Sequence, residues 1–245
     1  MSTVIAVTSG KGGTGKTSFT GAVGSCLAAL GHRTLCIDMD VGLRNLDLAL
    51  GLSDRALMDF TDVLGNRCSL EKAAVEHPDI QGLYLLTAPV TLDRTPDLHA
   101  MRKLLRQARY HYDYILLDAP AGLGESFRLA VCSCDRAVVV STNDASSLRD
   151  AQRTVAELMG WTDQIHLVVN RVQPRLLRRL HTTIDDAMDS AGLPLLGVVP
   201  EDSKVMLAAN TGRPLILCTS RGAAVAYLHI ARRLLGQKVP LMRIH

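Results

Sequence analysis

The chain of 245 residues has few aromatic side chains, since Phe, Tyr and Trp together make up 4% of it. Its core must therefore be aliphatic, and hydrophobic residues do make up 47% of the sequence. No apolar run approaches the ~20 residues that a membrane-spanning helix needs. No linker or low-complexity tract interrupts the sequence either. We therefore expect a single domain over residues 1–245, with a short tail at 236–245.

The six cysteines lack the C-x-x-C spacing of zinc and iron–sulfur sites. Cys132 and Cys134, the most closely spaced pair, are expected to pack as small apolar side chains. Cysteines that pack in this way are typical of a reducing compartment. The chain also starts with an apolar strand pattern instead of a signal peptide. We therefore expect a cytoplasmic protein.

What the sequence does contain is a glycine-rich octapeptide between an apolar run and a helical pattern. Residues 10–17 read Gly-Lys-Gly-Gly-Thr-Gly-Lys-Thr and fit the phosphate-loop pattern G-x-x-x-x-G-K-[ST]. We expect Lys16 to contact the β- and γ-phosphates of a nucleotide, and the Thr17 hydroxyl to ligate Mg²⁺. A close-packed turn between strand and helix is the alternative. The predicted phosphate-binding residues are Gly10, Lys11, Gly12, Gly13, Thr14, Gly15, Lys16, Thr17 and Ser18.

Two further apolar runs end in carboxylates. Asp38 and Asp40 follow the run at 34–37, and Asp118 follows the run at 114–117. Ligands bind at the carboxyl ends of the strands in open α/β sheets. We therefore expect Asp40 and Asp118 to lie near Mg²⁺, whereas Asp38 is equally well explained as an acidic strand end.

Lys11 gives the loop a second lysine, and with it the loop resembles the deviant phosphate loop of the MinD/ParA family of ATPases. The segment Asp-Val-Gly-Leu-Arg-Asn-Leu-Asp at 40–47 is similar to the first switch of the MinD branch. The segment Ala-Pro-Ala-Gly ending at Gly122 resembles the second switch. The resemblance implies that Asp40 activates the attacking water and that Gly122 senses the γ-phosphate. It also implies that Lys11 acts across an ATP-dependent homodimer.

The same resemblance extends to two strand ends that are expected to bind adenine. In the family a Pro-Glu-Asp loop lines the base. At the preceding strand end, where MinD relatives differ, the side-chain amide of Asn170 can pair with the edge of adenine. For Asn170 the alternative is an ordinary turn residue at a strand end. The predicted adenine-binding residues are Asn170, Arg171, Pro200, Glu201 and Asp202.

Apolar runs alternate with helical patterns along the whole chain. Their order predicts an α/β three-layer fold of the P-loop NTPase type, with a mostly parallel sheet and helices on both faces. The predicted strands are 3–8, 34–37, 82–86, 114–117, 137–140, 165–169 and 195–199. The predicted helices are 16–30, 95–109, 145–159, 178–190 and 223–235.

Positive charge is concentrated late in the chain. Residues 171–245 carry 11 Lys and Arg against 5 Asp and Glu, although the net charge is only +3. Arg175, Arg178 and Arg179 belong to this excess. Such a surface can meet DNA phosphates or anionic lipid, and it can also be a solvated helix face.

The resemblance implies a function in positioning the division septum or related machinery. Mg-ATP binding and slow hydrolysis would switch the homodimer, with a protein activator or division-site partner at the inner face of the cell membrane. The alternative is a ParA-type partition ATPase that acts on DNA. A metabolic synthetase of the same superfamily would need a substrate domain in addition, and the length of this chain does not provide one. Because Pro240 interrupts the tail, we expect the tail to fold back and to bind lipid weakly.

Overall fold

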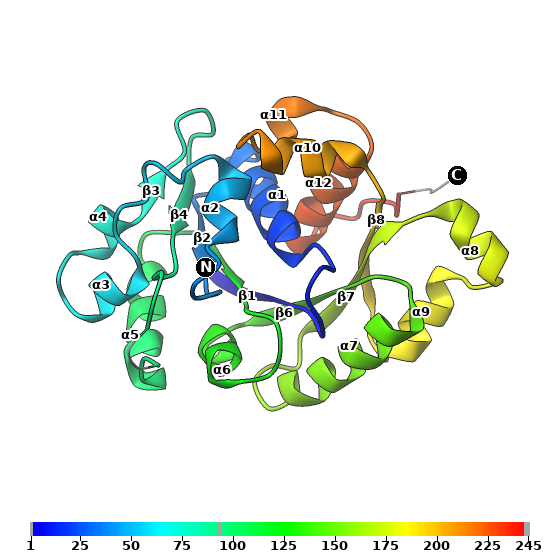
Figure 1. The fold of residues 1–245 in the computed structure, drawn as a ribbon, viewed down its shortest axis with the longest axis horizontal. Helices are drawn as coiled ribbons and strands as arrows, with labels where there is room; N and C mark the ends of the chain where they lie inside the picture. The colour runs from blue at the N-terminus through cyan, green and yellow to red at the C-terminus, as the bar shows by residue number, and fades with distance from the viewer. Residues whose placement is uncertain (1, 93–94, 243–245) are drawn as a thin grey trace.

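The predicted apolar runs form the central sheet of the molecule (Figure 1). The computed structural model describes residues 2–92 and 95–242. Within these residues one sheet has the strand order β3-β4-β2-β5-β1-β6-β7-β8, and its pairs are parallel except for β3 with β4. The strands are β1 (Thr3–Thr8), β2 (Thr34–Asp38), β3 (Val75–Glu76), β4 (Leu83–Leu86), β5 (Tyr114–Asp118), β6 (Arg136–Ser141), β7 (Ile165–Val172) and β8 (Leu195–Pro200).

Helices cover both faces of this sheet, as the alternating pattern predicts (Figure 1). One face packs against α1 (Lys16–Ala29), α2 (Asn45–Leu50), α10 (Ser203–Asn210), α11 (Leu215–Cys218) and α12 (Ala223–Leu234). The other face packs against α3 (Phe60–Leu64), α4 (Leu70–Ala73), α5 (Leu98–Ala108), α6 (Glu125–Val131), α7 (Ala145–Leu158) and α9 (Ile184–Ala191). The remaining helix, α8 (Pro174–Leu180), contributes no buried residue.

The core is aliphatic, as the composition requires. Along β1 the side chains alternate, so that Val4 packs into one core cluster and Ile5 into the other. Burying such a side chain stabilises the fold by roughly 1.5–3 kcal/mol. The few aromatic residues bridge elements, and Phe19 of α1 meets Tyr227 of α12 edge to face at 6.0 Å. Cys132 and Cys134 are buried in the first cluster, which confirms that they pack as apolar side chains.

Two predicted helices differ from the structure. The stretch predicted as 178–190 forms two helices, because His181 adopts a left-handed conformation (φ 52°) and ends α8. The Thr183 side chain then caps a new helix by accepting from the Asp186 N–H. The helix predicted from residue 95 starts at Leu98 instead, because Asp97 caps it. In both cases a local cap overrides the helical period.

The short elements β3, α2, α3, α4, α6, α10 and α11 were not predicted from the sequence. The longest of them, α10, has only 8 residues. Two turns of helix are too short for hydrophobic periodicity to distinguish them from an apolar loop. They nevertheless position the site, because α2 follows the first switch and α10 follows β8.

The C-terminal tail folds back onto α12, as expected from its proline. The Arg233 guanidinium donates to the Val239 carbonyl from Nε (3.0 Å) and Nη2 (2.8 Å). Met242 packs against the second core cluster. Arg243, which belongs to the basic excess, lies outside the described residues.

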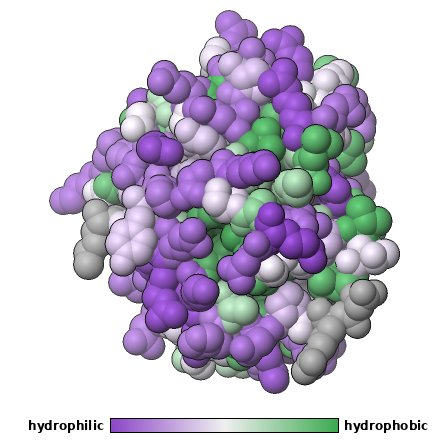
Figure 2. Space-filling view, turned by 90° about the vertical axis from the view of Figure 1, so that its left-hand side faces the viewer, coloured by the Kyte–Doolittle hydropathy of each residue, from purple (hydrophilic) through white to green (hydrophobic). Residues whose placement is uncertain are grey.

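No described helix is both long and apolar enough to cross a membrane. Figure 2 shows the side of the molecule that is on the left in Figure 1. That side is mainly hydrophilic, with hydrophobic side chains in an irregular strip through its middle and toward the right-hand edge.

Candidate functional site

The predicted phosphate loop connects β1 to α1 at the carboxyl edge of the sheet (Figure 1). Gly15 has φ 87°, and a Cβ at this position would overlap the side-chain nitrogen of Asn170. Helix α1 begins at Lys16 without a side-chain cap and without an acidic residue in its first turn. Its backbone N–H groups and dipole therefore favour an anion at this end. The Thr14 hydroxyl is buried and lacks a hydrogen-bond partner within the described residues.

Asp118 is the centre of a buried polar cluster next to this loop. The Lys16 Nζ lies 3.0 Å from one of its carboxylate oxygens, and the Thr17 hydroxyl donates to the other at 2.7 Å. The Thr20 hydroxyl donates as well, at 3.1 Å. The structure thus brings together Lys16, Thr17 and Asp118, which were predicted from separate motifs. Thr20 was missed, although it lies one helical turn beyond Lys16 and so on the same face of α1.

Asp38 anchors the first switch. One of its carboxylate oxygens accepts from the Asp40 N–H at 2.9 Å, and the other accepts from the Leu46 N–H at 3.2 Å. Asp38 pairs with Asp118 in the β2–β5 register. Burial, together with the charge of Asp118, raises the pKa of Asp38 to about 7. The strand-end alternative therefore describes Asp38 better than a ligand role does.

Asp40 projects from the same switch and is half-buried. Burial raises the pKa of its carboxyl, the positive charge of Lys16 opposes this, and the negative charge of Asp118 adds to it. The three carboxylates and Lys16 are therefore electrostatically coupled. A carboxylate with a raised pKa is a better proton acceptor, which suits the role predicted for Asp40.

We predict that Asp38→Asn changes how stability depends on pH when neither nucleotide nor Mg²⁺ is present. Between about pH 4 and pH 7 the unfolded chain releases the Asp38 proton while the folded chain retains it, so rising pH destabilises the fold. The asparagine does not titrate. Between pH 5 and pH 8 the melting temperature of the variant should rise relative to the parent by on the order of 5 °C. The control is Asp163→Asn at an exposed position, for which the difference in melting temperature from the parent should be the same at pH 5 and at pH 8. The same result for Asp38→Asn would contradict the prediction.

The predicted adenine residues line one cleft of about 420 Å³ beside the phosphate loop. Gly15 and Ser18 form its phosphate-loop end. All five predicted adenine residues line it as well, Asn170 and Arg171 from β7, Pro200 from the end of β8, and Glu201 and Asp202 from the turn between β8 and α10. The other residues that line the cleft were not predicted from the sequence. All but one of them belong to α10, which is too short to be recognised from its hydrophobic pattern, and the last belongs to α12. These residues are Ser203, Val205, Met206, Ala209, Asn210 and Tyr227.

The side chains of three predicted adenine residues, Asn170, Arg171 and Asp202, also bind backbone groups of this chain. The Asn170 side-chain N–H donates to the Thr14 carbonyl at 2.7 Å, which leaves its own carbonyl oxygen for a base edge. The Asp202 carboxylate accepts from the N–H of Lys204 at 3.0 Å and from that of Ala223 at 3.1 Å. Asp202 therefore holds the starts of α10 and α12 in place.

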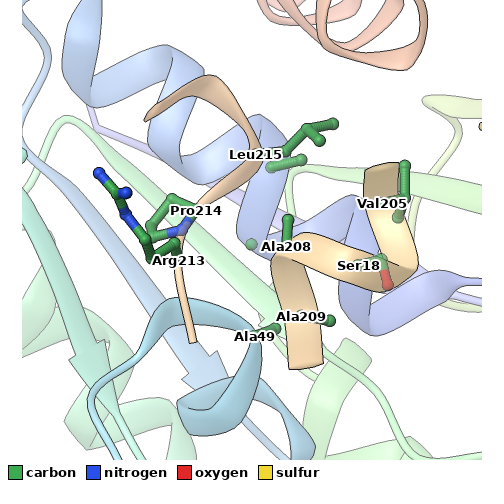
Figure 3. A pocket seen from close by; sticks show the side chains of 10 residues that line it. Ser18, Ala49, Val205, Ala208, Ala209, Arg213, Pro214 and Leu215 are labelled. Carbon is green, nitrogen blue, oxygen red and sulfur yellow. The ribbon is translucent and has the colours of Figure 1, made fainter. Parts of the chain in front are cut away.

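Behind α10 lies a second, much smaller pocket (Figure 3). Its volume is about 20 Å³, room for about one water molecule, which is too small for a nucleotide. Ser18, Val205 and Ala209 border both this pocket and the larger cleft. The base site is therefore the larger cleft.

Lys11 and Gly122, two further predicted residues, are partly exposed and exposed, respectively. The Lys11 Nζ is 3.1 Å from a carboxylate oxygen of Asp144 and 2.9 Å from the Ser146 hydroxyl. Burial opposes ionisation of Asp144, but hydrogen bonds from neighbouring hydroxyls hold its pKa well below the usual range. Gly122 is exposed between β5 and α6 with φ 90°. In this structure Lys11 therefore binds side chains of its own chain.

The fold and these contacts can be compared with known proteins. A family model described as the CobQ/CobB/MinD/ParA nucleotide binding domain matches residues 5–215. The septum site-determining protein MinD of Synechocystis sp. is 39% identical over 251 residues, which cover 99% of this chain and 92% of that protein. The chain belongs to the MinD family.

Solved MinD structures share the whole fold. The MinC:MinD cell division protein complex of Aquifex aeolicus contains a chain that is 37% identical, with a TM-score of 0.91 and coverage of 99% of both chains. The septum site-determining protein MinD of Pyrococcus horikoshii, complexed with Mg-ADP, is 29% identical, with a TM-score of 0.86 and coverage of 96% of both chains. The three-layer P-loop fold expected for a MinD relative is therefore confirmed.

Proposed function

We propose that this chain is a MinD-type ATPase whose Mg-ATP-dependent dimer positions cell-division machinery. The observation that carries the proposal is the buried cluster of Lys16, Thr17 and Asp118 beside the phosphate loop. A cation, a hydroxyl and a carboxylate beside a phosphate loop are the groups that bind the phosphates and the magnesium ion of a nucleotide, and this supports the proposal. Membership of the MinD family supports adenine as the nucleotide base, Mg²⁺ as the metal ion and placement of the division site as the cellular process.

The residues present fit a magnesium nucleotide. Within the part of the chain that the structure describes, the buried Thr14 hydroxyl has no hydrogen-bond partner, and no side chain caps the N–H groups at the start of α1. Thr17 and Asp118 would hold Mg²⁺, with Asp40 beside it, because oxygen ligands suit this ion. The cleft along β7 and β8 would take the adenine. A bound Mg-ATP supplies the phosphoanhydride and the metal charge that offsets its negative oxygens.

The residues of this chain then have separate tasks. The phosphate loop binds and orients the anion, and Lys16 supplies a buried positive charge. Asp40 accepts a proton from, or orients, the attacking water. Asp38 holds Asp40 in position through the backbone of the first switch. Gly122 offers its amide to the γ-phosphate side.

We further propose that Lys11 acts across an ATP-dependent homodimer. Lys16 already serves the phosphates in its own subunit, so a second cation is most useful on the nucleotide of the facing subunit. Lys11 would have to leave Asp144 to reach it. That contact is half-exposed, and such ion pairs contribute only about 0.2–1 kcal/mol, so the release costs little.

Partners beyond the second copy follow from the relatives. The MinC:MinD complex supports a MinC-like division-site partner for this chain.

The test of the proposed activity is phosphate release from ATP, measured with Mg²⁺ and with EDTA. Slow release that requires Mg²⁺ is expected, and the absence of release even with candidate partners would contradict the proposal.

A specific observation also favours DNA as a second surface, as in ParA-type partition ATPases. Helix α8 has no buried residue, and its Arg175, Arg178 and Arg179 side chains are exposed. Among the described residues none of the three makes an ion pair with an acid. Exposed arginines of this kind can neutralise DNA phosphates.

We predict that replacing these three arginines with glutamine weakens nonspecific DNA binding. Each arginine that meets a phosphate contributes about 0.9 to the salt slope of the association constant, so the slope should fall by up to ~2.7. Gel shifts at several salt concentrations measure it, with anionic liposomes at matched salt as the competing surface. Equal DNA binding by parent and variant would show that the three arginines of α8 do not contact DNA and are only exposed to solvent.

A further inference from the structure

The end of β7 holds the phosphate loop through two successive side chains. The Asn170 Nδ2 donates to the Thr14 carbonyl at 2.7 Å, and the Arg171 Nη1 donates to the Gly13 carbonyl at 3.3 Å. Asn170 is 3% exposed, so its hydrogen bond is shielded from water. The two carbonyls are consecutive in the loop. The contact is therefore a pair of adjacent attachments that run from one strand end to one loop.

The local backbone of β7 explains how both side chains reach the same loop. In a regular strand, neighbouring side chains point to opposite faces. Here the register between β7 and β8 shifts between Val169 and Val172, and Arg171 adopts φ 56°. The Arg171 Nε also donates to the Glu201 carboxylate at 2.9 Å, which fixes the guanidinium from the β8 side. The irregular strand end thus serves to aim the two side chains.

The geometry of the peptide bond gives these contacts a consequence for anion binding. In a planar trans peptide, the C=O of one residue and the N–H of the next point in opposite directions. Holding the Thr14 carbonyl outward therefore turns the Gly15 N–H toward the inside of the loop. Holding the Gly13 carbonyl does the same for the Thr14 N–H. Inward N–H groups are what a phosphate loop uses to bind an anion.

We propose that Asn170 and Arg171 are positioning residues for phosphate, in addition to lining the base cleft. They preset the orientation of the Thr14 and Gly15 amides, so that the loop does not pay for this ordering when the nucleotide binds. The inference rests on the proposed ATP site and deepens it. It also links the two ends of that site, because a base seated in the cleft contacts the same residues that hold the phosphate loop.

A ligand without a base separates positioning from base contact. Inorganic tripolyphosphate, titrated calorimetrically into the full chain, reports on the loop alone, and ATP reports on loop and base together. Asn170→Ala should weaken binding of both ligands by about tenfold, because it leaves the Thr14 carbonyl without its buried donor. Asn210→Ala, in α10 at the same cleft, is the matched control and should leave tripolyphosphate binding unchanged.

Arg171→Lys supplies a second variant at an exposed position, where folding is not at risk. Lysine keeps the positive charge but lacks the planar guanidinium group, so it cannot donate to the Glu201 carboxylate and to the Gly13 carbonyl at the same time. Tripolyphosphate binding should weaken about threefold, whereas a purely electrostatic role would leave it unchanged. Hydrogen exchange at the Gly15 amide should accelerate in Asn170→Ala relative to the parent, measured at a temperature at which both proteins are folded.

The outcomes distinguish this inference from the proposed function. If Asn170→Ala and Arg171→Lys bind tripolyphosphate like the parent, with only ATP weakened, both residues contact the base alone and the inference is wrong. If the parent itself binds neither ATP nor tripolyphosphate, the proposed function fails, and the inference fails with it. Parallel losses for both ligands in the variants, with binding by the parent, support it.

Discussion

Lys16→Ala should abolish ATP binding. The lysine is 8% exposed, and its Nζ offsets the buried charge of Asp118 at 3.0 Å. Without it, the phosphates would meet Asp118 and Asp40 with no cation of this subunit between them. Truncating one partner of a buried, hydrogen-bonded charge pair in a complex costs about 2–5 kcal/mol, which corresponds to a loss of roughly thirtyfold to several thousandfold in affinity. Calorimetry with ATP measures it.

Folding has to be checked in the same experiment, because Lys16→Ala leaves Asp118 buried without its partner. Lys16→Gln retains a hydrogen-bond donor for Asp118 and should fold normally while still lacking the charge. The matched control is Lys103→Ala on the exposed face of α5, which should bind ATP like the parent. A folded Lys16 variant with the affinity of the parent would show that the loop does not bind the phosphates in the proposed way.

Asp40→Ala should separate binding from hydrolysis. The carboxylate is half-buried beside Lys16 and has a raised pKa, so it suits a water-activating group. General-base catalysis of this kind contributes about 10²–10⁴ to a rate. Single-turnover phosphate release should slow by such a factor, while ATP affinity stays within a few-fold of the parent. The ATP-bound dimer should then persist, because hydrolysis no longer ends it.

Two variants define the control for this result. Asp54→Ala, at an exposed position in the loop after α2, should hydrolyse ATP at the rate of the parent. Asp38→Ala should instead disturb both steps, because it releases the Asp40 and Leu46 amides. Hydrolysis by Asp40→Ala at the rate of the parent would assign water activation to another residue.

The sequence could predict the sheet and the phosphate end of the site because their signals are local. Val4 to Val7 form an apolar run, and Lys16 and Thr17 stand at fixed spacing within one octapeptide. Asp118 was found in the same way, at the end of its own strand. Parallel topology then brings these strand ends together without further information.

The base end was less predictable because its contacts are distant in the chain. The bond from Asn170 to Thr14 spans 156 residues, and no spacing rule connects them. The pairing of Lys11 with Asp144 spans 133 residues and depends on how α7 is capped. The α8–α9 break depends on a single left-handed residue, His181, that helical periodicity does not reveal.

The central claim is that this chain is a nucleotide-switched dimer, and its mass in solution tests that claim most directly. Light scattering should be measured on the parent with Mg-ATP, with Mg-ADP and without nucleotide, and on Lys11→Ala with Mg-ATP. We expect twice the 26.5 kDa of the chain for the parent with Mg-ATP, and the monomer mass in the other samples. A parent that stays monomeric with Mg-ATP, or a Lys11→Ala variant that dimerises like the parent, would contradict the claim.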